Sequence, residues 1–332
     1  MTDHPIIQSR MPFRVFDNFG NLTALKVFPD GRRMAANSSD GMLRVWDFKK
    51  GVLLKELEMR GERMRDLAIS RDGKLIVGSD KGYYLTAWDG DTGRRLIQVP
   101  EFCLSKVYSF DISPDGATLA IGNSSLEVTL RNTATWQLQG EPIKYRMPGI
   151  VSSVRYSPSG QFLAIAAMSQ VRIWDPTTGK HIATLNQANS PVWTPDSTRL
   201  LTVCYGAIQQ WDSSTWKPLG SSICMGDTRD FCVAVNCNST VVAFPTTQNR
   251  VRLWHLVDCR TIALFQLSQI PCCITFSVDG KHIFTGGEDQ KISVWAVPEN
   301  AWPEDNPNDQ VTNQVYSYSC SVCALSHFWY QG

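Results

Sequence analysis

Short runs of alternating apolar and polar residues occupy most of the chain. Residues 42–47, Met-Leu-Arg-Val-Trp-Asp, are one such run, and residues 170–175, Gln-Val-Arg-Ile-Trp-Asp, are another. A period of two is typical of β-strands, because successive side chains point to opposite faces. Asp, Gly, Pro and Ser cluster between the runs, where tight turns are expected. The pattern predicts an all-β protein built from many short strands.

The runs recur at a nearly fixed spacing. A Trp-Asp pair, or a looser copy of it, ends one run in each period: Trp46 and Asp47, Trp88 and Asp89, Trp174 and Asp175, Trp211 and Asp212, Trp254 and His255, Trp295 and Ala296. A further copy with Arg131 and Asn132 in these places fills the wide gap after Trp88. Successive copies are then 42, 43, 43, 37, 43 and 41 residues apart.

Two further landmarks keep step with the Trp position. A turn tetrad such as Ser-Pro-Asp-Gly precedes it in each of the seven copies, its third residue lying 15 or 16 residues before the Trp position. A Thr follows the Trp position by four residues in four copies, as Thr92, Thr135, Thr178 and Thr215. Three markers in phase over seven copies are a specific signal of a repeat protein.

These residues resemble the WD-repeat family over roughly residues 13–297. The resemblance implies a β-propeller in which each repeat of about 40–45 residues forms a four-stranded antiparallel blade. Seven copies imply seven blades. One blade is too small to bury its apolar faces alone, so we expect neighbouring blades to pack together with the Trp rings between them.

The two ends of the repeat region predict how the ring closes. The last copy has a third strand at residues 291–297, but no apolar fourth strand follows it. Residues 12–16, Pro-Phe-Arg-Val-Phe, form an orphan strand before the first copy. We therefore expect the N-terminal strand to complete the seventh blade, as is familiar in the resembling family. The predicted organisation is an N-terminal extension (1–11), the propeller (12–297) and a disordered or loosely docked C-terminal tail (298–332).

The chain departs from the family pattern in several places. The family often has a His before the inner strand that joins a polar network with the Trp, and none of the five His residues occupies that position. We expect this network to be incomplete. The third copy lacks its Trp, and the fifth copy is shorter than the others.

Composition adds limits on function. The formal net charge of +1 gives no whole-chain attraction to nucleic acid or anionic lipid. Residues 1–10 do not read as a signal peptide, and no stretch of about 20 apolar residues is present. The ten Cys are scattered, and we interpret most of them as small buried hydrophobic residues in a reducing compartment.

No catalytic motif is recognisable. The chain has no GxSxG, P-loop or HExxH sequence, and its acids are concentrated in turns, as with Asp30, Asp72, Asp115 and Asp279. Cys320, Cys323 and His327 have the spacing of half a metal site, but a closed zinc site needs four ligands and no fourth is nearby. We therefore predict no catalytic residue, no cofactor and no metal.

The leading hypothesis is a non-catalytic scaffold or adaptor of the cytoplasm or nucleus, neither secreted nor in a membrane, that binds other proteins. Nothing in the sequence indicates a homo-oligomer. Arg and Tyr are enriched at interfaces, and several predicted loops on one rim carry such residues. The candidate protein-binding rim is Arg60, Arg63, Arg65, Lys81, Tyr83, Tyr145, Arg146, Arg229 and Phe231.

Two alternatives remain. An enzyme or small-ligand binder would use the central channel, and would need polar groups converging there from several inner strands. The predicted inner strands, such as 67–69 and 151–156, look mostly apolar, which counts against this alternative. Binding of nucleic acid through Arg60, Arg63, Arg65 and Arg146 ranks last, because the overall charge is balanced.

Overall fold

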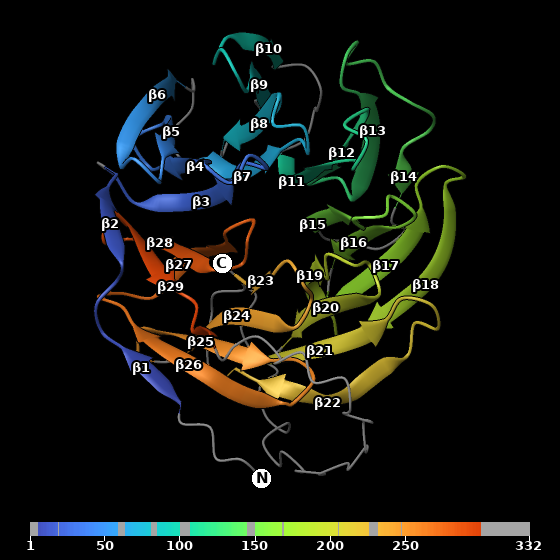
Figure 1. The fold of residues 1–332 in the computed structure, drawn as a ribbon. Coiled ribbons are helices and arrows are strands. Elements are labelled where there is room, and N and C mark those ends of the chain that lie inside the picture. The colour runs from blue at the N-terminus through green and yellow to red at the C-terminus, as the bar shows by residue number, and fades with distance from the viewer. Residues whose placement is uncertain are drawn as a thin grey trace, which may run out of the picture. The chain divides into compact units, whose positions relative to one another are not determined.

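The computed structural model describes residues 6–18, 20–58, 64–80, 85–99, 107–144, 150–167, 169–204, 206–225, 232–246 and 248–299. These residues form seven separate β-sheets arranged as blades around a central axis (Figure 1). They contain no helix that is both long and apolar enough to span a membrane. The predicted all-β, seven-bladed propeller is therefore confirmed.

In blades 1 to 5 the strands form an antiparallel sheet and run in sequence order from the channel outward, whereas blades 6 and 7 each gain an outer strand from the N-terminal segment. The first four blades are as follows. Blade 1 has β3 (Leu22–Val27), β4 (Arg33–Ser38), β5 (Met42–Asp47) and β6 (Val52–Glu58). Blade 2 has β7 (Met64–Ile69), β8 (Leu75–Asp80), β9 (Leu85–Asp89) and β10 (Arg95–Val99). Blade 3 has β11 (Val107–Ile112), β12 (Thr118–Asn123), β13 (Glu127–Asn132) and β14 (Ile143–Lys144). Blade 4 has β15 (Val151–Tyr156), β16 (Leu163–Ala167), β17 (Gln170–Asp175) and β18 (Lys180–Asn186).

The last three blades complete the ring. Blade 5 has β19 (Asn189–Trp193), β20 (Arg199–Cys204), β21 (Ala207–Asp212) and β22 (Pro218–Cys224). Blade 6 has β23 (Ala234–Val235), β24 (Val241–Thr246), β25 (Arg250–His255) and β26 (Arg260–Gln266). Blade 7 has β27 (Pro271–Phe276), β28 (His282–Gly287) and β29 (Lys291–Ala296), and its outer strand is β2 (Arg14–Asp17).

The N-terminal strand closes the ring as predicted. β2 pairs antiparallel with β29, with Arg14 opposite Val294 and Phe16 opposite Ile292. Phe16 is 5% exposed and meets the Trp46 ring edge-on at 5.6 Å between centroids, so it joins blade 7 to blade 1. Arg14 donates to the backbone carbonyls of Phe48 and Lys49 in blade 1. The closing strand therefore holds both sides of the junction.

One further strand was not predicted. β1 (Ile7–Ser9) pairs in parallel with β26 and becomes a fifth strand on the outer edge of blade 6. Three residues are too few to show a period-two pattern, so this strand could not be recognised from the sequence.

The apolar core is divided among the interfaces between blades. Each of seven buried clusters combines residues of two adjacent blades. Trp46, Trp88 and Trp295 are buried in their clusters, and Trp174, Trp211 and Trp254 pack half-buried against theirs. The prediction that the repeat Trp residues fill the interblade space is confirmed.

Blade 3 compensates for its missing Trp. Trp136, in the turn after β13, packs against the cluster between blades 2 and 3 that contains Leu85, Phe110 and Leu119. Trp136 has a φ of 62°, a left-handed conformation uncommon for residues other than glycine. A ring from the turn thus replaces a ring from the strand.

The shorter fifth copy has lost part of a connection, not a strand. Only Gln187 and Ala188 separate β18 from β19, and blade 5 retains four strands of five to seven residues.

The interpretation of the cysteines was wrong for most of those described. Cys224, Cys237, Cys259 and Cys272 are exposed, Cys232 is half-buried, and Cys273 is buried. The apolar neighbours of these residues point into the blades, whereas alternation along a strand or a turn position turns the thiol outward.

We predict that closure depends on Phe16. Phe16→Ala removes a buried ring at the junction of blades 7 and 1 and should lower the free energy of unfolding by about 3–5 kcal/mol. Urea denaturation followed by intrinsic fluorescence measures this change.

Phe13→Ala is the matched control, because Phe13 is 68% exposed on the same segment and should cost no more than about 0.5 kcal/mol. Equal effects of the two substitutions would contradict the role assigned to Phe16.

Candidate functional site

Some of the repeat Trp residues donate their indole N–H to a Thr hydroxyl on the neighbouring strand, and others have no such acceptor among the described residues. Trp211 Nε1 donates to Thr202 Oγ1 at 2.8 Å, and Trp295 Nε1 donates to Thr285 Oγ1 at 3.1 Å. Each Thr lies two residues after the cross-strand neighbour of its Trp. In blades 1, 4 and 6 the same position holds Ala36, Ile165 and Phe244, whose side chains have no hydrogen-bond acceptor.

The loss of the hydroxyl has a visible result. The buried Nε1 atoms of Trp46, Trp174 and Trp254 have no hydrogen-bond partner among the described residues. These three Trp rings are therefore held by packing alone, without a hydrogen bond from the indole to any described residue. This agrees with the expectation that the polar network of the family is incomplete here.

The Asp of the repeat pair shapes the turn between the third and fourth strands. Asp212 Oδ1 accepts the Ser214 hydroxyl at 2.6 Å, and the Thr215 N–H and hydroxyl at 2.8 and 2.9 Å. These bonds lower the pKa of Asp212 to about 2. Asp89 and Asp175 make equivalent bonds to Thr92 and Thr178, and Asn132 makes them to Thr135. The Thr four residues after each Trp position is therefore a turn residue.

The tetrad acids have a similar role. Asp30, Asp72, Asp115 and Asp279 each accept a backbone N–H from the residue two positions later. This is the turn function expected from the sequence.

The predicted rim lies outside the residues whose side chains the structure describes. This applies to Arg60, Arg63, Arg65, Lys81, Tyr83, Tyr145, Arg146, Arg229 and Phe231, of which Arg65 alone belongs to a described strand, β7. Cys320, Cys323 and His327 are also outside the described residues. The rim stays a prediction.

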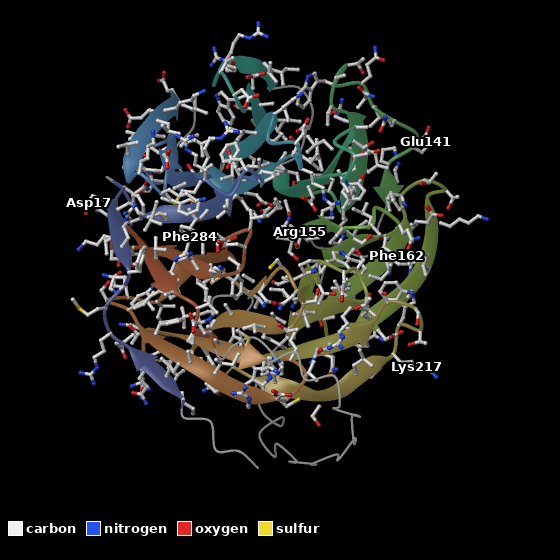
Figure 2. All side chains as sticks on the ribbon, in the orientation of Figure 1. Asp17, Glu141, Arg155, Phe162, Lys217 and Phe284 are labelled. Carbon is white, nitrogen blue, oxygen red and sulfur yellow. The ribbon has the colours of Figure 1, made fainter. Side chains whose placement is uncertain are left out.

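Charged side chains instead meet inside the central channel. A cavity of about 540 Å³ is lined by the inner strands, with Lys26 of β3, Asp66 of β7, Asp111 of β11 and Arg155 of β15 among its residues. Lys26, Asp111 and Arg155 each lie two residues before the turn tetrad, so they occupy one ring of equivalent positions. Arg155 lies at the channel side of β15 (Figure 2).

This cluster corrects the sequence-based argument against the channel. The apolar residues counted there, such as Leu67 and Val154, are buried between blades. Their neighbours Asp66 and Arg155 alternate with them and face the channel. The inner strands are therefore apolar on one face and polar on the other, and polar groups do converge from several blades.

Arg155 and Asp66 form the centre of the cluster. Arg155 Nη1 is 3.3 Å from Asp66 Oδ2, 3.0 Å from Ser109 Oγ and 3.2 Å from the Phe110 carbonyl oxygen. Ser109 donates its hydroxyl to the same Asp66 oxygen at 2.9 Å. The ion pair thus joins blades 2, 3 and 4 across the channel wall.

Asp111 and Lys26 are held differently. The two carboxylate oxygens of Asp111 accept the backbone N–H groups of Ile112 and Tyr156. Burial raises the pKa of Asp111, although Arg155 opposes the shift. Burial, followed by repulsion from Arg155, lowers the pKa of Lys26. The Lys26 side chain is exposed to solvent, but that solvent lies inside the channel, whose walls surround the side chain.

The opposite side of the channel is apolar. Val192, Cys232, Val233 and Ile274 line it from blades 5, 6 and 7. The channel therefore has an ionic half, contributed by blades 1 to 4, and a half of aliphatic and thiol groups.

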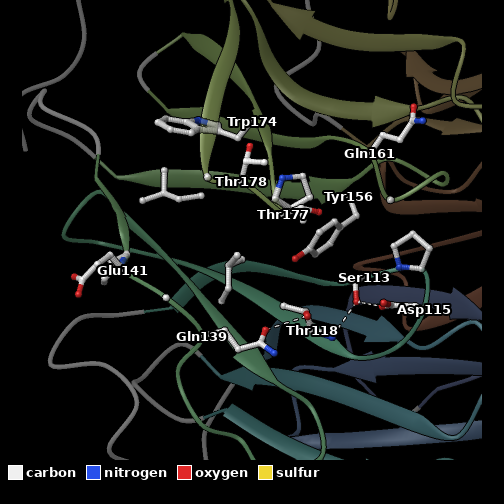
Figure 3. A pocket seen from close by; sticks show the side chains of 18 of the residues that line it. Ser113, Asp115, Thr118, Gln139, Glu141, Tyr156, Gln161, Trp174, Thr177 and Thr178 are labelled. Atoms are coloured by element: carbon white, nitrogen blue, oxygen red, sulfur yellow. Dashed lines mark hydrogen bonds between the residues drawn. The ribbon is translucent and has the colours of Figure 1, made fainter.

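A second hollow lies between blades 3 and 4. This groove, of about 950 Å³, has Tyr156, Trp174 and Thr178 on one side and Thr118 and Gln139 on the other (Figure 3). It exists because β14 is only two residues long and leaves much of the neighbouring blade face uncovered.

Several hydroxyl groups of the groove are already bonded within the fold, whereas the Trp174 indole N–H has no partner among the described residues. The Ser113 hydroxyl donates to Asp115, Thr118 Oγ1 donates to Gln139 Oε1 at 3.1 Å, and Thr178 donates to Asp175. The channel is therefore the stronger candidate site. Among the described residues, no group of three or more His, Cys, Asp or Glu side chains is placed to hold a metal.

Comparison with known proteins agrees with this architecture. A family profile described as "WD domain, G-beta repeat" matches residues 12–47 and 266–296, which contain β2–β5 and β27–β29. The chain is therefore similar to proteins of the WD-repeat family and has the β-propeller fold that this similarity implies.

Individual relatives carry the same kind of name. "WD repeat-containing protein 1" of Mus musculus is 27% identical over 243 residues, covering 68% of this chain and 35% of that protein. Its Xenopus tropicalis counterpart is 23% identical over 323 residues, with 88% and 50% coverage. "Protein groucho" of Drosophila melanogaster is 25% identical over 171 residues, with 50% and 22% coverage. This WD-repeat chain thus spans half or less of the length of these relatives.

We predict that the two Trp–Thr bonds stabilise their blades. Thr202→Val and Thr285→Val preserve side-chain shape but leave an indole N–H buried without an acceptor, so each should cost about 1–2 kcal/mol in chemical denaturation.

Thr129→Val supplies the control, because the Thr129 hydroxyl is buried and has no partner among the described residues. Replacing it should be neutral or slightly stabilising. A cost at Thr129 equal to that at Thr202 would show that the hydroxyl bond to the indole is not the cause.

We also predict an acid-dependent contribution from Asp212. Because its folded pKa is lowered from 3.8 to about 2, its stabilisation is complete above about pH 4 and is lost as pH falls towards 2. Asp212→Asn keeps the Oδ1 acceptor without the charge. The Tm gap between wild type and this variant should therefore be largest at neutral pH and shrink below pH 4.

Asn132→Asp is the reciprocal variant in blade 3 and should gain Tm at neutral pH that disappears in acid. A gap that stays constant with pH in both variants would contradict the assignment.

Proposed function

We propose that this WD-repeat propeller is a non-catalytic platform that binds other proteins, with the central channel as a principal contact site. The observation that supports this proposal most directly is a difference between the charged groups of the channel. The acids are held by hydrogen bonds within the protein, whereas the cations have N–H donors that make no hydrogen bond to the described residues. Binding requires groups that are held in place and still unsatisfied.

Both oxygens of each acid accept hydrogen bonds from the protein. Asp66 Oδ1 accepts the Leu67 N–H, and Asp66 Oδ2 accepts from Ser109 and Arg155. Both oxygens of Asp111 accept backbone N–H groups. A general base needs a carboxylate that can reach a substrate proton, and these bonds favour a positioning role for both acids.

The closed ring supports the same function. Apolar clusters join adjacent blades around the ring, so the channel wall is a rigid surface that loses little conformational freedom on binding. The rim residues proposed from the sequence, from Arg60 to Phe231, would add contacts around this centre.

We expect the protein in the cytoplasm or nucleus. One relative is named "U3 small nucleolar RNA-associated protein 21 homolog" in Schizosaccharomyces pombe, and another is named "Pre-mRNA-processing factor 19" in Oryza sativa subsp. japonica. These names support the nuclear part of the proposal. We do not extend RNA association to this chain, since its net charge is only +1.

The test is capture of partners by the full chain. Tagged protein is isolated from nuclease-treated extracts, co-purifying proteins are quantified by mass spectrometry against the tag alone, and the leading candidates are purified and mixed with it. We expect at least one to form a stoichiometric complex on analytical size exclusion. Absence of any such complex would contradict a protein-binding platform. So would partners that are captured from untreated extracts but not from nuclease-treated ones.

A further inference from the structure

Lys26 is an unpaired cation in the wall of the channel. It lies on β3 and lines the same cavity as Asp66, Asp111 and Arg155. Among the described residues its ammonium group has no hydrogen-bond or ion-pair partner, although each of these three charged groups acts on it through space. The ammonium therefore has three donors available to a ligand.

Arg155 has a used edge and an unused edge. All of its hydrogen bonds to described residues come from Nη1, which is close to Asp66, Ser109 and the Phe110 carbonyl. Nε and Nη2 make no hydrogen bond to the described residues, and the side chain is 30% exposed. These two nitrogens form the planar donor pair that suits a carboxylate.

The ionic half holds two cations, Lys26 and Arg155, and two acids, Asp66 and Asp111, and both acids already accept hydrogen bonds. Asp66 is paired with Arg155, and the charge of Asp111 is compensated by two backbone N–H groups and disfavoured by burial. Lys26 makes no hydrogen bond to the described residues; Arg155 repels its charge, and Asp66 and Asp111 attract it through space. A single negative charge that contacts both cations would offset the repulsion between them, and it would be repelled by the two acids less than a dianion would.

The far wall suits the rest of such a ligand. Val192, Val233 and Ile274 present aliphatic surface to the same cavity. The methylene groups of an acidic side chain could pack there while its head reaches the cations, because a Glu side chain joins a short apolar stem to a charged end.

We propose that the channel binds a carboxylate from an acidic segment of a partner protein, held between the Lys26 ammonium and the unused edge of Arg155. The ligand class is a Glu or Asp side chain presented at the channel mouth. This inference rests on the proposed protein-binding function and makes it specific.

The test uses a fluorescein-labelled peptide of alternating Glu and Gly, with an otherwise identical Gln peptide as the uncharged probe. Fluorescence anisotropy with the full chain should show saturable binding of the Glu peptide, about tenfold tighter than the Gln peptide. Lys26→Met should weaken binding of the Glu peptide by about tenfold, since it removes a charge-assisted hydrogen bond.

Two further variants test whether peptide affinity depends on charges inside the channel. Lys180→Met removes an exposed Lys from β18, on the outside of blade 4, and should leave the affinity unchanged. Asp111→Asn removes a negative charge from the channel and should tighten binding of the Glu peptide. Thermal melts verify that each variant is folded.

Equal binding of the Glu and Gln peptides, or unchanged affinity in Lys26→Met, would overturn the proposal. So would weaker binding in Asp111→Asn, because the acids would then be the ligand-binding groups. Displacement of the peptide by inorganic phosphate but not by glutarate would assign the site to phosphate instead. If stoichiometric partners are captured while the Glu peptide fails to bind, the platform function stands and the carboxylate site is rejected.

Discussion

Every blade of this propeller buries its two faces against its two neighbours, and the seven interfaces form a closed circuit of apolar contacts. The circuit is completed by a strand from the far end of the chain: Phe16 of β2 reaches the Trp46 ring in blade 1. The channel is a by-product of this closure, since its wall consists of seven inner segments that are held from behind. The charged groups of the channel keep their relative positions because the packing behind them is continuous.

The interfaces tolerate loss of the polar network because apolar contact carries most of the stabilisation. Within the part of the chain that the structure describes, only Trp211 and Trp295 keep a hydroxyl acceptor from the neighbouring strand. In blade 3 the strand Trp is replaced altogether, and Trp136 enters the same interface from the adjoining turn. What is retained at each interface is a large ring in the right volume, whatever segment supplies it.

The number of blades, their order and the mode of closure could be predicted because they depend on local chemistry that repeats. Turn tetrads need Gly or Asp at defined places, and an Asp such as Asp212 needs a Thr three residues later. The channel cluster was missed for a different reason. Lys26, Asp66 and Arg155 belong to different blades, and only the ring brings them together.

The channel cluster was also missed because the two faces of each inner strand were considered together, without separating alternate residues. The neighbours Leu67 and Asp66 have opposite environments, and averaging them conceals the polar face. The exposed cysteines were misjudged in the same way. Strand β1 escaped notice because its partner, β26, lies more than 250 residues away in sequence and its own three residues carry no pattern.

The placement of β1 also determines where the beginning of the chain can be reached. β1 precedes β2 in the sequence and lies along the outer edge of blade 6, whereas β2 lies on the outer edge of blade 7 (Figure 1). A fluorophore attached to β1 itself, for example at Ile7, would therefore lie at the circumference, on the outer edge of blade 6. Labels at that end would leave the axial opening unobstructed, and a surface-immobilised form tethered there would stand with its axis free.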